Sequence, residues 1–331
     1  MKFITLTIAL ALGAVMAPLV PATNANAAEI KLAVGCPPVP ACADWVWAVD
    51  VAEHLKKSGL EAKVFVGGAL GKDPEIIDQL SQGLVQIGLT NFVMIAQVDK
   101  RILGFISAYM FDDMDHFFRA SKDSDMVRSI DANMQKQGIR IAGLTGLGGL
   151  VGIFNAKKPI RSIADLDGIR LRAIDDSQIK LFEQWGAAGA VIDMPEFATS
   201  VQQGVVDGYF NPPIVAIIFR HMGILKHYTP IGGGTPFRSA LMSNDWYNGL
   251  DDDTRAKVDA AVNNANANNV AWTKKAIETE LAILKKGGVT ITEPSEAALA
   301  EFKELSMKVW SVLMPADAVD AFVALAAKTR K

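Results

Sequence analysis

The sequence predicts an α/β fold of two lobes, with a ligand cleft between them and one long helix that spans both. Three features of the chain indicate this architecture. Short apolar segments alternate with helical patterns from residue 30 onward, an order that favours parallel strands joined by helices. Residues 82–91 and 203–211 repeat one pattern, and residues 251–286 contain neither proline nor glycine.

The first half of the chain contains three predicted strands separated by two helices. The second of these helices begins with Asp73 followed by proline, and Gly83 stands where a helix commonly ends. The predicted strands are residues 30–34, 62–66 and 85–89, and the predicted helices are residues 44–57 and 73–82.

The second half shows the same alternation of strand and helix. Its second helix opens with Met194-Pro195-Glu196 and stops at Gly204. The predicted strands are residues 169–173 and 205–210, and the predicted helices are residues 176–185 and 194–204.

Each half places an asparagine, Asn91 or Asn211, at the end of a predicted strand, after a Gln-Gly pair and a short apolar run. Ligands of open parallel sheets bind beyond the carboxyl ends of the strands. The two asparagines therefore favour a cleft between two similar lobes. The alternative is that Gln-Gly-x-Val is a common helix end and the similarity is a coincidence.

A long helix is expected from Asp251 to Gly287. Acidic residues at its start suit a helix N-terminus. A helix of this length spans about 50 Å, more than one domain, so we expect it to cross from one lobe to the other. The asparagine-rich segment 263–269 is its weakest helix-forming part and the expected place for a bend.

The N-terminus is typical of an exported protein. Residues 1–27 combine a basic start, an uncharged apolar run and a small-x-small cleavage motif, as a secretory signal peptide does. A membrane anchor is the alternative, but Pro18, Pro21 and the cleavage motif argue against it. The net charge of −3 is small and mixed, which gives no indication of nucleic acid or an anionic membrane surface.

The only two cysteines are Cys36 and Cys42, on either side of a proline-rich loop. In an oxidising compartment this arrangement favours a small-loop disulfide. A zinc site would need further ligands nearby, and the sequence shows none.

Catalytic motifs are scarce. The four histidines lack metal-binding spacing, and the chain has no Gly-x-Ser-x-Gly motif. The glycine-rich segments 67–71 and 232–234 lack the residues of a phosphate loop and are interpreted as turns. The sequence therefore predicts a binding protein rather than an enzyme, with no cofactor and no metal.

Binding chemistry is better represented, since Arg170 and Arg172 lie two residues apart on one predicted strand and should share a face. An arginine on an apolar strand needs a partner, because an unpaired buried charge costs several kcal/mol. That partner is either a ligand carboxylate or an acid of the chain, such as Asp165, Asp167 or Asp175. For Arg170 the structural salt bridge is favoured, whereas spacing alone does not decide for Arg172.

Taken together, the motifs resemble the DctP-type solute-binding proteins of TRAP (tripartite ATP-independent periplasmic) transporters. The resemblance covers essentially the whole chain after residue 27. It is carried by Gly-Gly-Ala-Leu-Gly at 67–71, the segment 163–172 that ends in Arg-Leu-Arg, Gly186-Ala187, Glu196, and the segment 204–212 that ends in Phe-Asn-Pro.

The resemblance implies a periplasmic-binding-protein-like fold whose lobes close on a ligand, and it implies roles for single residues. Arg172 would clamp the ligand carboxylate, and Asn211 would face the same ligand. Asn91 would contact it from the first lobe, and Met194 would line the cleft. The loop after the first strand, around Cys36 and Trp45, would border it.

Several positions depart from the family pattern. Phe210 replaces a glutamate often found before the asparagine, and Phe92 follows Asn91. The segment 148–154 is apolar and rich in glycine, where sialic-acid-type members carry another cation. With Trp45 or Trp47, these residues favour a small monocarboxylate with an apolar or aromatic body.

The predicted function is therefore periplasmic capture of an organic acid and delivery to TRAP membrane permease subunits by a monomer. The alternatives are a periplasmic receptor that presents its ligand to a sensor kinase, and, less favoured, a periplasmic enzyme. The predicted lobes are residues 28–149 with 238–277, and residues 150–237 with 278–331.

Overall fold

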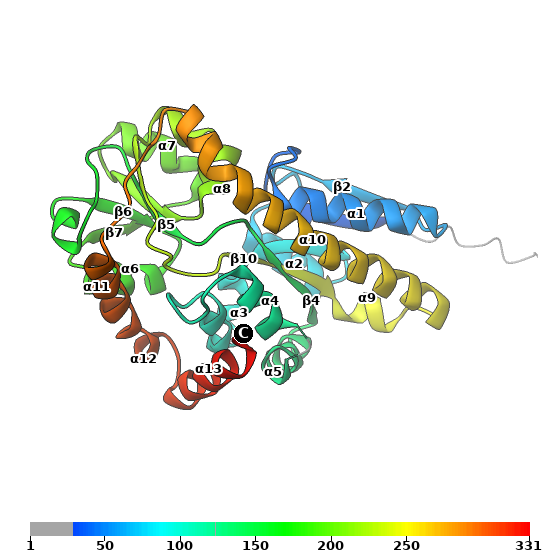
Figure 1. Ribbon diagram of the computed structural model, residues 1–331. Helices are drawn as coiled ribbons and strands as arrows, with labels where there is room; N and C mark the ends of the chain where they lie inside the picture. The colour runs from blue at the N-terminus through cyan, green and yellow to red at the C-terminus, as the bar shows by residue number, and fades with distance from the viewer. Residues whose placement is uncertain (1–28, 123) are drawn as a thin grey trace, which may run out of the picture.

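A computed structural model describes residues 29–122 and 124–331. Its strands form two sheets, one of five strands and one of six, which lie in separate lobes (Figure 1). This arrangement confirms the predicted α/β fold class. The predicted signal peptide, residues 1–27, lies outside the described residues. Within the described ranges, no helix combines the length and the apolar character needed to cross a membrane.

The first sheet has the strand order β2-β1-β3-β10-β4. Its first three strands are parallel, and β10 runs antiparallel between β3 and β4. The strands are β1 (Ile30–Val34), β2 (Ala62–Phe65), β3 (Ile87–Asn91), β4 (Ile139–Gly146) and β10 (Phe237–Ser243).

Both faces of the first sheet are buried, which explains why its strands are continuous apolar runs. Leu32 and Leu89 belong to a core shared with α1 (Ala43–Lys57). On the opposite face, Ala33 and Leu241 belong to a second core. The alternation follows the two-residue period of a strand.

The second sheet has the strand order β11-β9-β5-β8-β6-β7. The strands β6, β7 and β8 are parallel, and β5 pairs antiparallel with β8 and β9. A Cβ atom on Gly208 would collide with the carbonyl oxygen of Phe154, so glycine is needed where β8 meets β5. The strands are β5 (Gly152–Asn155), β6 (Arg170–Ala173), β7 (Ala188–Val191), β8 (Gly208–Asn211), β9 (His227–Thr229) and β11 (Thr290–Ile291).

The repeated sequence pattern corresponds to a repeated structure. β3 and β8 begin two and three residues later than predicted and end at Asn91 and Asn211. They begin late because the two amides that follow the glycine still donate hydrogen bonds to the preceding helix. Before β3 both amides donate to the carbonyl of Gln79 in α2 (Asp73–Ser81), and before β8 both donate to the carbonyl of Ser200 in α7 (Phe197–Gln202).

The predicted long helix is α10 (Asp252–Lys286), with 35 residues. It packs on α1 and β4 of the first lobe and on α8 (Pro213–Ile218) of the second, and so spans both lobes as predicted (Figure 1). The helix is continuous through the asparagine-rich segment. Asn269 instead exchanges two hydrogen bonds with the backbone of Gly146, at 2.7 and 3.1 Å, and so attaches α10 to the end of β4.

The remaining helical elements surround the two sheets. They are α3 (Val93–Ala96), η1 (Lys100–Phe105), α4 (Met114–Ser121), α5 (Asp125–Gln135), η2 (Ile163–Leu166), α6 (Asp176–Gln184), η3 (Met194–Glu196), η4 (His221–Gly223), α9 (Asn244–Asn248), α11 (Glu296–Met307), α12 (Trp310–Leu313) and α13 (Ala316–Thr329).

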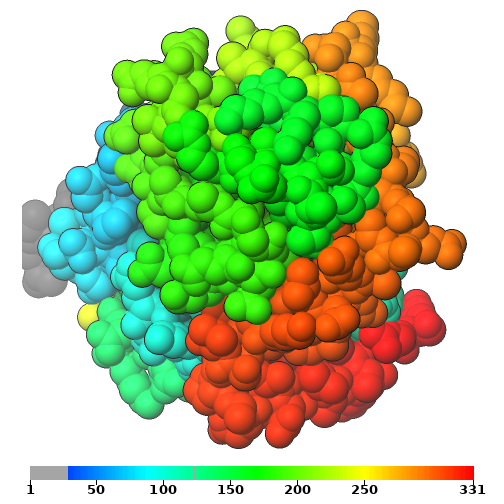
Figure 2. All heavy atoms as spheres, turned by 90° about the vertical axis from the view of Figure 1, so that its left-hand side faces the viewer, coloured from blue at the N-terminus to red at the C-terminus, as the bar shows by residue number. Residues whose placement is uncertain are grey.

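The C-terminal segment runs from the second lobe back to the first. Figure 2 shows it in orange and red, next to the second lobe in green. In α13, the buried ring of Phe322 lies 4.9 Å from that of Phe105 and belongs to the same core as Phe237. The predicted assignment of residues 278–331 to the second lobe therefore needs a correction for α13, because Phe322 completes the core of the first lobe.

A buried carboxyl group holds one of the segments that connect the lobes. The chain crosses from β4 to β5 through Gly148 and Gly149, and Glu280 of α10 accepts a hydrogen bond from the amide of Gly149 at 3.0 Å. Its second oxygen is buried without a partner among the described residues. Burial raises the pKa of Glu280 to about 7, although the bond from Gly149 acts in the opposite direction.

We expect Glu280→Gln to change the pH dependence of stability. The folded state keeps a proton on Glu280 that the unfolded chain releases near pH 4.5, so this residue makes the wild type less stable as the pH rises from about 4.5 to 7. The shift corresponds to roughly 3 kcal/mol. Glutamine retains the acceptor for Gly149, so the variant should gain stability relative to wild type over this range.

Urea unfolding of both proteins between pH 4.5 and 8 measures this difference. Glu278→Gln, at an exposed position of the same helix, is the control and should follow the wild type. A constant difference in unfolding free energy between Glu280→Gln and wild type across the range would contradict the prediction.

Candidate functional site

Arg172 is buried near the carboxyl end of β6, with an exposed fraction of 6%. Its Nε donates a hydrogen bond to the carbonyl of Ile192 at 2.6 Å. No carboxylate of the described residues lies within salt-bridge distance. Burial lowers the pKa of Arg172 to about 10, so the group remains charged at neutral pH. The remaining guanidinium donors are available to an external anion.

Arg170 lies on the same strand but in a different environment. Its guanidinium is half-exposed and lies 3.5 Å from Asp207, whose carboxylate also accepts a 2.8 Å bond from the Arg170 amide. Lys157 contacts the same carboxylate at 2.9 Å. Burial raises the pKa of Asp207, but these hydrogen bonds outweigh burial and lower it. Arg170 therefore has a structural partner, which is Asp207 rather than any of the three acids considered from the sequence.

The first lobe contains a buried arginine that offers a direct contrast. Arg238 of β10 lies 2.9 Å from the carboxylate of Asp44 and 3.7 Å from that of Asp73. Burial raises the pKa of Asp44, and the charge of Arg238 opposes that shift. Each lobe thus contains a largely buried arginine, but only Arg238 has carboxylates within salt-bridge distance among the described residues. No sequence pattern singled out Arg238.

Three polar groups lie on the same side of the second sheet as Arg172. The register of β6 and β8 pairs Arg172 with Tyr209, and Asn211 follows two residues later on the same face. His221 lies close by, with its ring 5.9 Å from that of Tyr209. Sequence reasoning missed Tyr209, although its two-residue spacing from Asn211 was visible. It also missed the role of His221, which comes into place only through tertiary packing.

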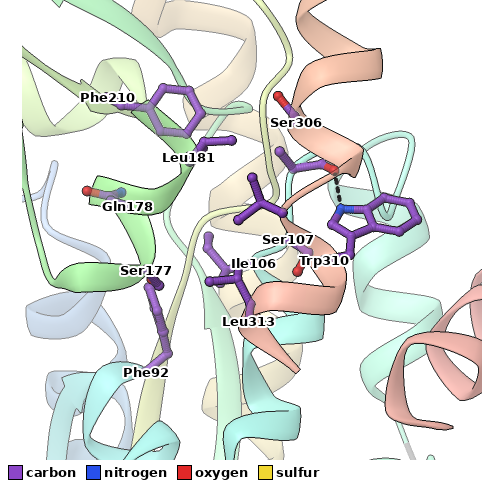
Figure 3. A pocket seen from close by; sticks show the side chains of 12 residues that line it. Phe92, Ile106, Ser107, Ser177, Gln178, Leu181, Phe210, Ser306, Trp310 and Leu313 are labelled. Atoms are coloured by element: carbon purple, nitrogen blue, oxygen red, sulfur yellow. Dashed lines mark hydrogen bonds between the residues drawn. The ribbon is translucent and has the colours of Figure 1, made fainter. Parts of the chain in front are cut away.

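Phe210 points to the other side of the same sheet, where its ring lies 5.1 Å from that of Trp185. It lines a small pocket between the lobes together with Phe92 of the first lobe (Figure 3). The pocket wall also includes the indole of Trp310, which donates to the carbonyl of Ala108 at 3.0 Å. The two phenylalanines predicted for the cleft are thus brought together, with Leu181 and Gln178 of α6 beside them.

The other predicted residues fall into different positions. Asn91 is partly buried, and its side-chain oxygen accepts from the amide of Val93 at 3.1 Å, which fixes the turn after β3. Met194 begins η3 and packs partly buried against the core that contains Tyr209. Trp45 is half-buried on α1. Trp47 is a core residue that donates to Asn266 at 2.8 Å, so the option that Trp47 lines the pocket is wrong.

Cys36 and Cys42 form a disulfide, in line with the prediction from their spacing. Their sulfur atoms lie close to the carboxylate of Asp44, a grouping that would otherwise suit a metal ion. Because both sulfurs are engaged in the disulfide, this cluster does not offer thiolate ligands.

Residues 46–315 match a known family model, described as bacterial extracellular solute-binding protein, family 7 (DctP). The chain belongs to this family. Its membership confirms the resemblance to TRAP solute-binding proteins and the prediction of a binding protein rather than an enzyme.

The DctP-family chain is 25% identical over 278 residues to an ectoine/5-hydroxyectoine-binding periplasmic protein of Ruegeria pomeroyi, a match that covers 80% of this chain and 79% of the relative. It is also 25% identical over 249 residues to a C4-dicarboxylate-binding periplasmic protein of Rhodobacter capsulatus, which covers 73% and 72% of the two chains.

Two solved structures show the same fold. A TRAP periplasmic solute-binding protein of Desulfovibrio desulfuricans with bound sn-glycerol-3-phosphate has a TM-score of 0.84 at 21% identity, with 92% of this chain and 97% of that chain covered. One of Shewanella oneidensis with bound succinate has a TM-score of 0.83 at 19% identity, with 92% and 99% covered.

An ion pair joins the two lobes of this DctP-family protein close to Arg172. Lys72, at the start of α2, lies 2.8 Å from Asp193. Asp193 directly follows Ile192, whose carbonyl holds the Arg172 side chain. The loop that orients Arg172 is therefore also the loop that contacts the first lobe.

We expect Lys72→Glu to weaken ligand binding by about two- to fivefold, the range for an exposed ion pair, chiefly by raising the dissociation rate. The reason is that the pair forms only when the lobes meet. Combining Lys72→Glu with Asp193→Lys should restore binding, and high salt should remove the difference. Stopped-flow measurement of the dissociation rate of an acid that the protein binds tests this expectation.

Lys180→Glu is the control, since Lys180 pairs with Glu183 inside one helix of the second lobe. If the double reversal bound no better than either single reversal, an interlobe role for the pair would be wrong.

Proposed function

We propose that this protein captures an organic acid in the periplasm and delivers it to the membrane permease of a TRAP transporter, with Arg172 clamping the ligand carboxylate. The observation that carries the proposal is the buried Arg172 guanidinium without an acidic partner among the described residues. A bidentate ligand carboxylate would supply that partner through charge-assisted hydrogen bonds.

The ligands of similar proteins support this function. One curated relative binds C4-dicarboxylates, and solved structures of the same fold hold succinate and β-D-galacturonate. These ligands are small organic acids. The relatives are also described as periplasmic, which agrees with the signal peptide predicted for residues 1–27.

The pocket between Phe92 and Phe210 favours a ligand with an apolar or aromatic body. Its wall combines these rings with Leu181 and Trp310 and offers few polar groups, among them Gln178. Gln178 already accepts a 2.9 Å hydrogen bond from the amide of Ile174. Arg172 lies on the other side of the second sheet and is not part of this pocket wall. A small monocarboxylate with its charge at Arg172 would therefore extend its body over the carboxyl ends of β6 and β8 towards this pocket.

The other candidate residues have supporting roles in this proposal. Asn211 and Asn91 face the ligand from the ends of β8 and β3, and Met194 and Trp45 border the cleft. Arg170 holds Asp207 and does not contact the ligand. Closure is a hinge motion of two lobes, residues 28–149 with 238–277 and residues 150–237 with 278–331, with α13 attached to the first. The protein acts as a monomer.

A thermal-shift screen of organic acids tests the binding function. An acid that binds the folded state raises the melting temperature, and calorimetry should then show one site. The amide of each acid is the matched control, because it lacks the charge that Arg172 would bind. If the amides stabilised the protein as well as the acids, the carboxylate clamp would be wrong.

Delivery to a permease is tested in the organism that carries the gene. Deletion of the gene should abolish uptake of the acid found in the screen. Loss of a transcriptional response to the acid with unchanged uptake would favour the sensor-kinase alternative.

A further inference from the structure

Three buried polar atoms near Arg172 have no hydrogen-bond partner among the described residues. They are the hydroxyl of Tyr209, the amide nitrogen of Asn211 and Nδ1 of His221. An unpaired buried polar group costs about 1–3 kcal/mol, and native proteins contain few of them. Their concentration around one guanidinium that also lacks an acidic partner indicates a site that is completed by a ligand.

The four groups belong to one patch of the second lobe. Arg172 and Tyr209 are paired in register, and Tyr209 and Asn211 share a face of β8. The rings of Tyr209 and His221 both pack on Phe197, at 4.6 and 4.8 Å. Burial, and after it the charge of Arg172, lowers the pKa of His221 to about 4. The imidazole is therefore neutral at physiological pH and either donates or accepts a hydrogen bond.

The spacing of these groups exceeds what one carboxylate can satisfy. Tyr209 and Asn211 are two residues apart on a strand, so their Cα atoms are separated by about 6.5–7 Å. A carboxylate held bidentately by Arg172 can reach one of the two donors, whereas the other needs a second oxygen. Because Arg172 and Tyr209 lie on adjacent strands about 5 Å apart, the second oxygen must be close to the carboxylate.

We propose that Tyr209 and His221 form a second subsite, which binds an oxygen on the carbon next to the carboxylate held by Arg172 and Asn211, so that the ligand is a 2-oxo or 2-hydroxy acid. The inference rests on the proposed carboxylate clamp and adds the ligand class. A 2-oxo oxygen accepts from Tyr209, and the carboxylate accepts from Asn211. A 2-hydroxyl group in addition donates to neutral His221.

The test compares acids that differ only at this carbon. Three sets span the body size: propionate, lactate and pyruvate; 4-methylpentanoate with its 2-hydroxy and 2-oxo forms; and 3-phenylpropionate with its 2-hydroxy and 2-oxo forms. Calorimetry on the mature wild-type protein should show, in the set that fits best, about 100-fold tighter binding of an oxygenated acid. A site built to hydrogen-bond an oxygen rejects the analogue that lacks it.

Tyr209→Phe should weaken binding of the oxygenated acid about tenfold more than binding of the unsubstituted acid. Tyr228→Phe is the matched control, because Tyr228 is also a buried tyrosine that packs on Phe154 but does not face Arg172. It should keep the wild-type preference. Arg172→Ala should weaken the binding of oxygenated and unsubstituted acids equally. This result separates failure of the clamp from failure of the second subsite.

Equal binding of oxygenated and unsubstituted acids by the wild type would overturn the inference and leave the carboxylate clamp intact. An unchanged preference in Tyr209→Phe, or an equal loss of both kinds of acid in that variant, would also overturn it. If none of the nine acids bound while the wider screen found a different acid, the ligand class would be wrong.

Discussion

Arg172→Ala is expected to weaken carboxylate binding by at least about 100-fold. Removal of the guanidinium takes away two charge-assisted hydrogen bonds, each of which contributes about 1.5–3 kcal/mol. The variant should fold normally. No carboxylate of the described residues forms a salt bridge with Arg172, so the substitution leaves no buried acid without its cation. Calorimetry with the acid found in the screen measures the affinity, and thermal unfolding without ligand measures the stability.

Arg238→Ala is the matched control for this experiment. Arg238 is also largely buried but pairs with the buried Asp44, whose carboxylate would be left without its cation. Its replacement should lower the free energy of unfolding by about 3–5 kcal/mol, the cost of breaking a buried ion pair. The two arginines should therefore separate binding from stability. A variant lacking Arg172 that binds the acid with wild-type affinity would contradict the clamp.

Phe322→Ala should lower the free energy of unfolding by about 3–5 kcal/mol. Phe322 is fully buried, its ring meets that of Phe105 edge-on, and it packs directly over Gly104. No other aromatic residue of α13 can take its place in that core. Urea unfolding measures the loss.

The neighbouring Val323→Ala is the control, since Val323 is about half-exposed and its truncation should have little effect. Equal stability of Phe322→Ala and wild type would show that α13 does not contribute to the first-lobe core in solution.

Local patterns determined much of the fold. The period of apolar residues and the end signals Asp73-Pro74 and Gly83 located α2, and the absence of proline and glycine located α10 within one residue at each end. The repeated Gln-Gly pattern identified two strands that end in asparagine. These features are encoded within a few residues of chain, where capping, propensity and side-chain period act directly.

The different environments of Arg170 and Arg172 could not be predicted from local sequence patterns. Their spacing makes the two residues equivalent, and the three acids nearest in sequence were the natural candidates for partners. The actual partner of Arg170 is Asp207, which β8 brings to the start of β6. Arg172, two residues further along, has no carboxylate within salt-bridge distance among the described residues, and of the acids only the more distant charges of Asp193 and Asp175 act on it. Only strand pairing between distant segments decides which charge is neutralised.

The sequence by itself determined the α/β class, the two strand-end asparagines, the spanning helix and the arginine strand. The tertiary structure alone decided that Tyr209 and His221 lie near Arg172, that Phe210 and Phe92 line one pocket, and that α13 returns to the first lobe. The physical reason is range: helix ends and strand periods depend on neighbours in sequence, whereas the burial and charge pairing described above join residues that are, for example, 37, 194 and 202 positions apart.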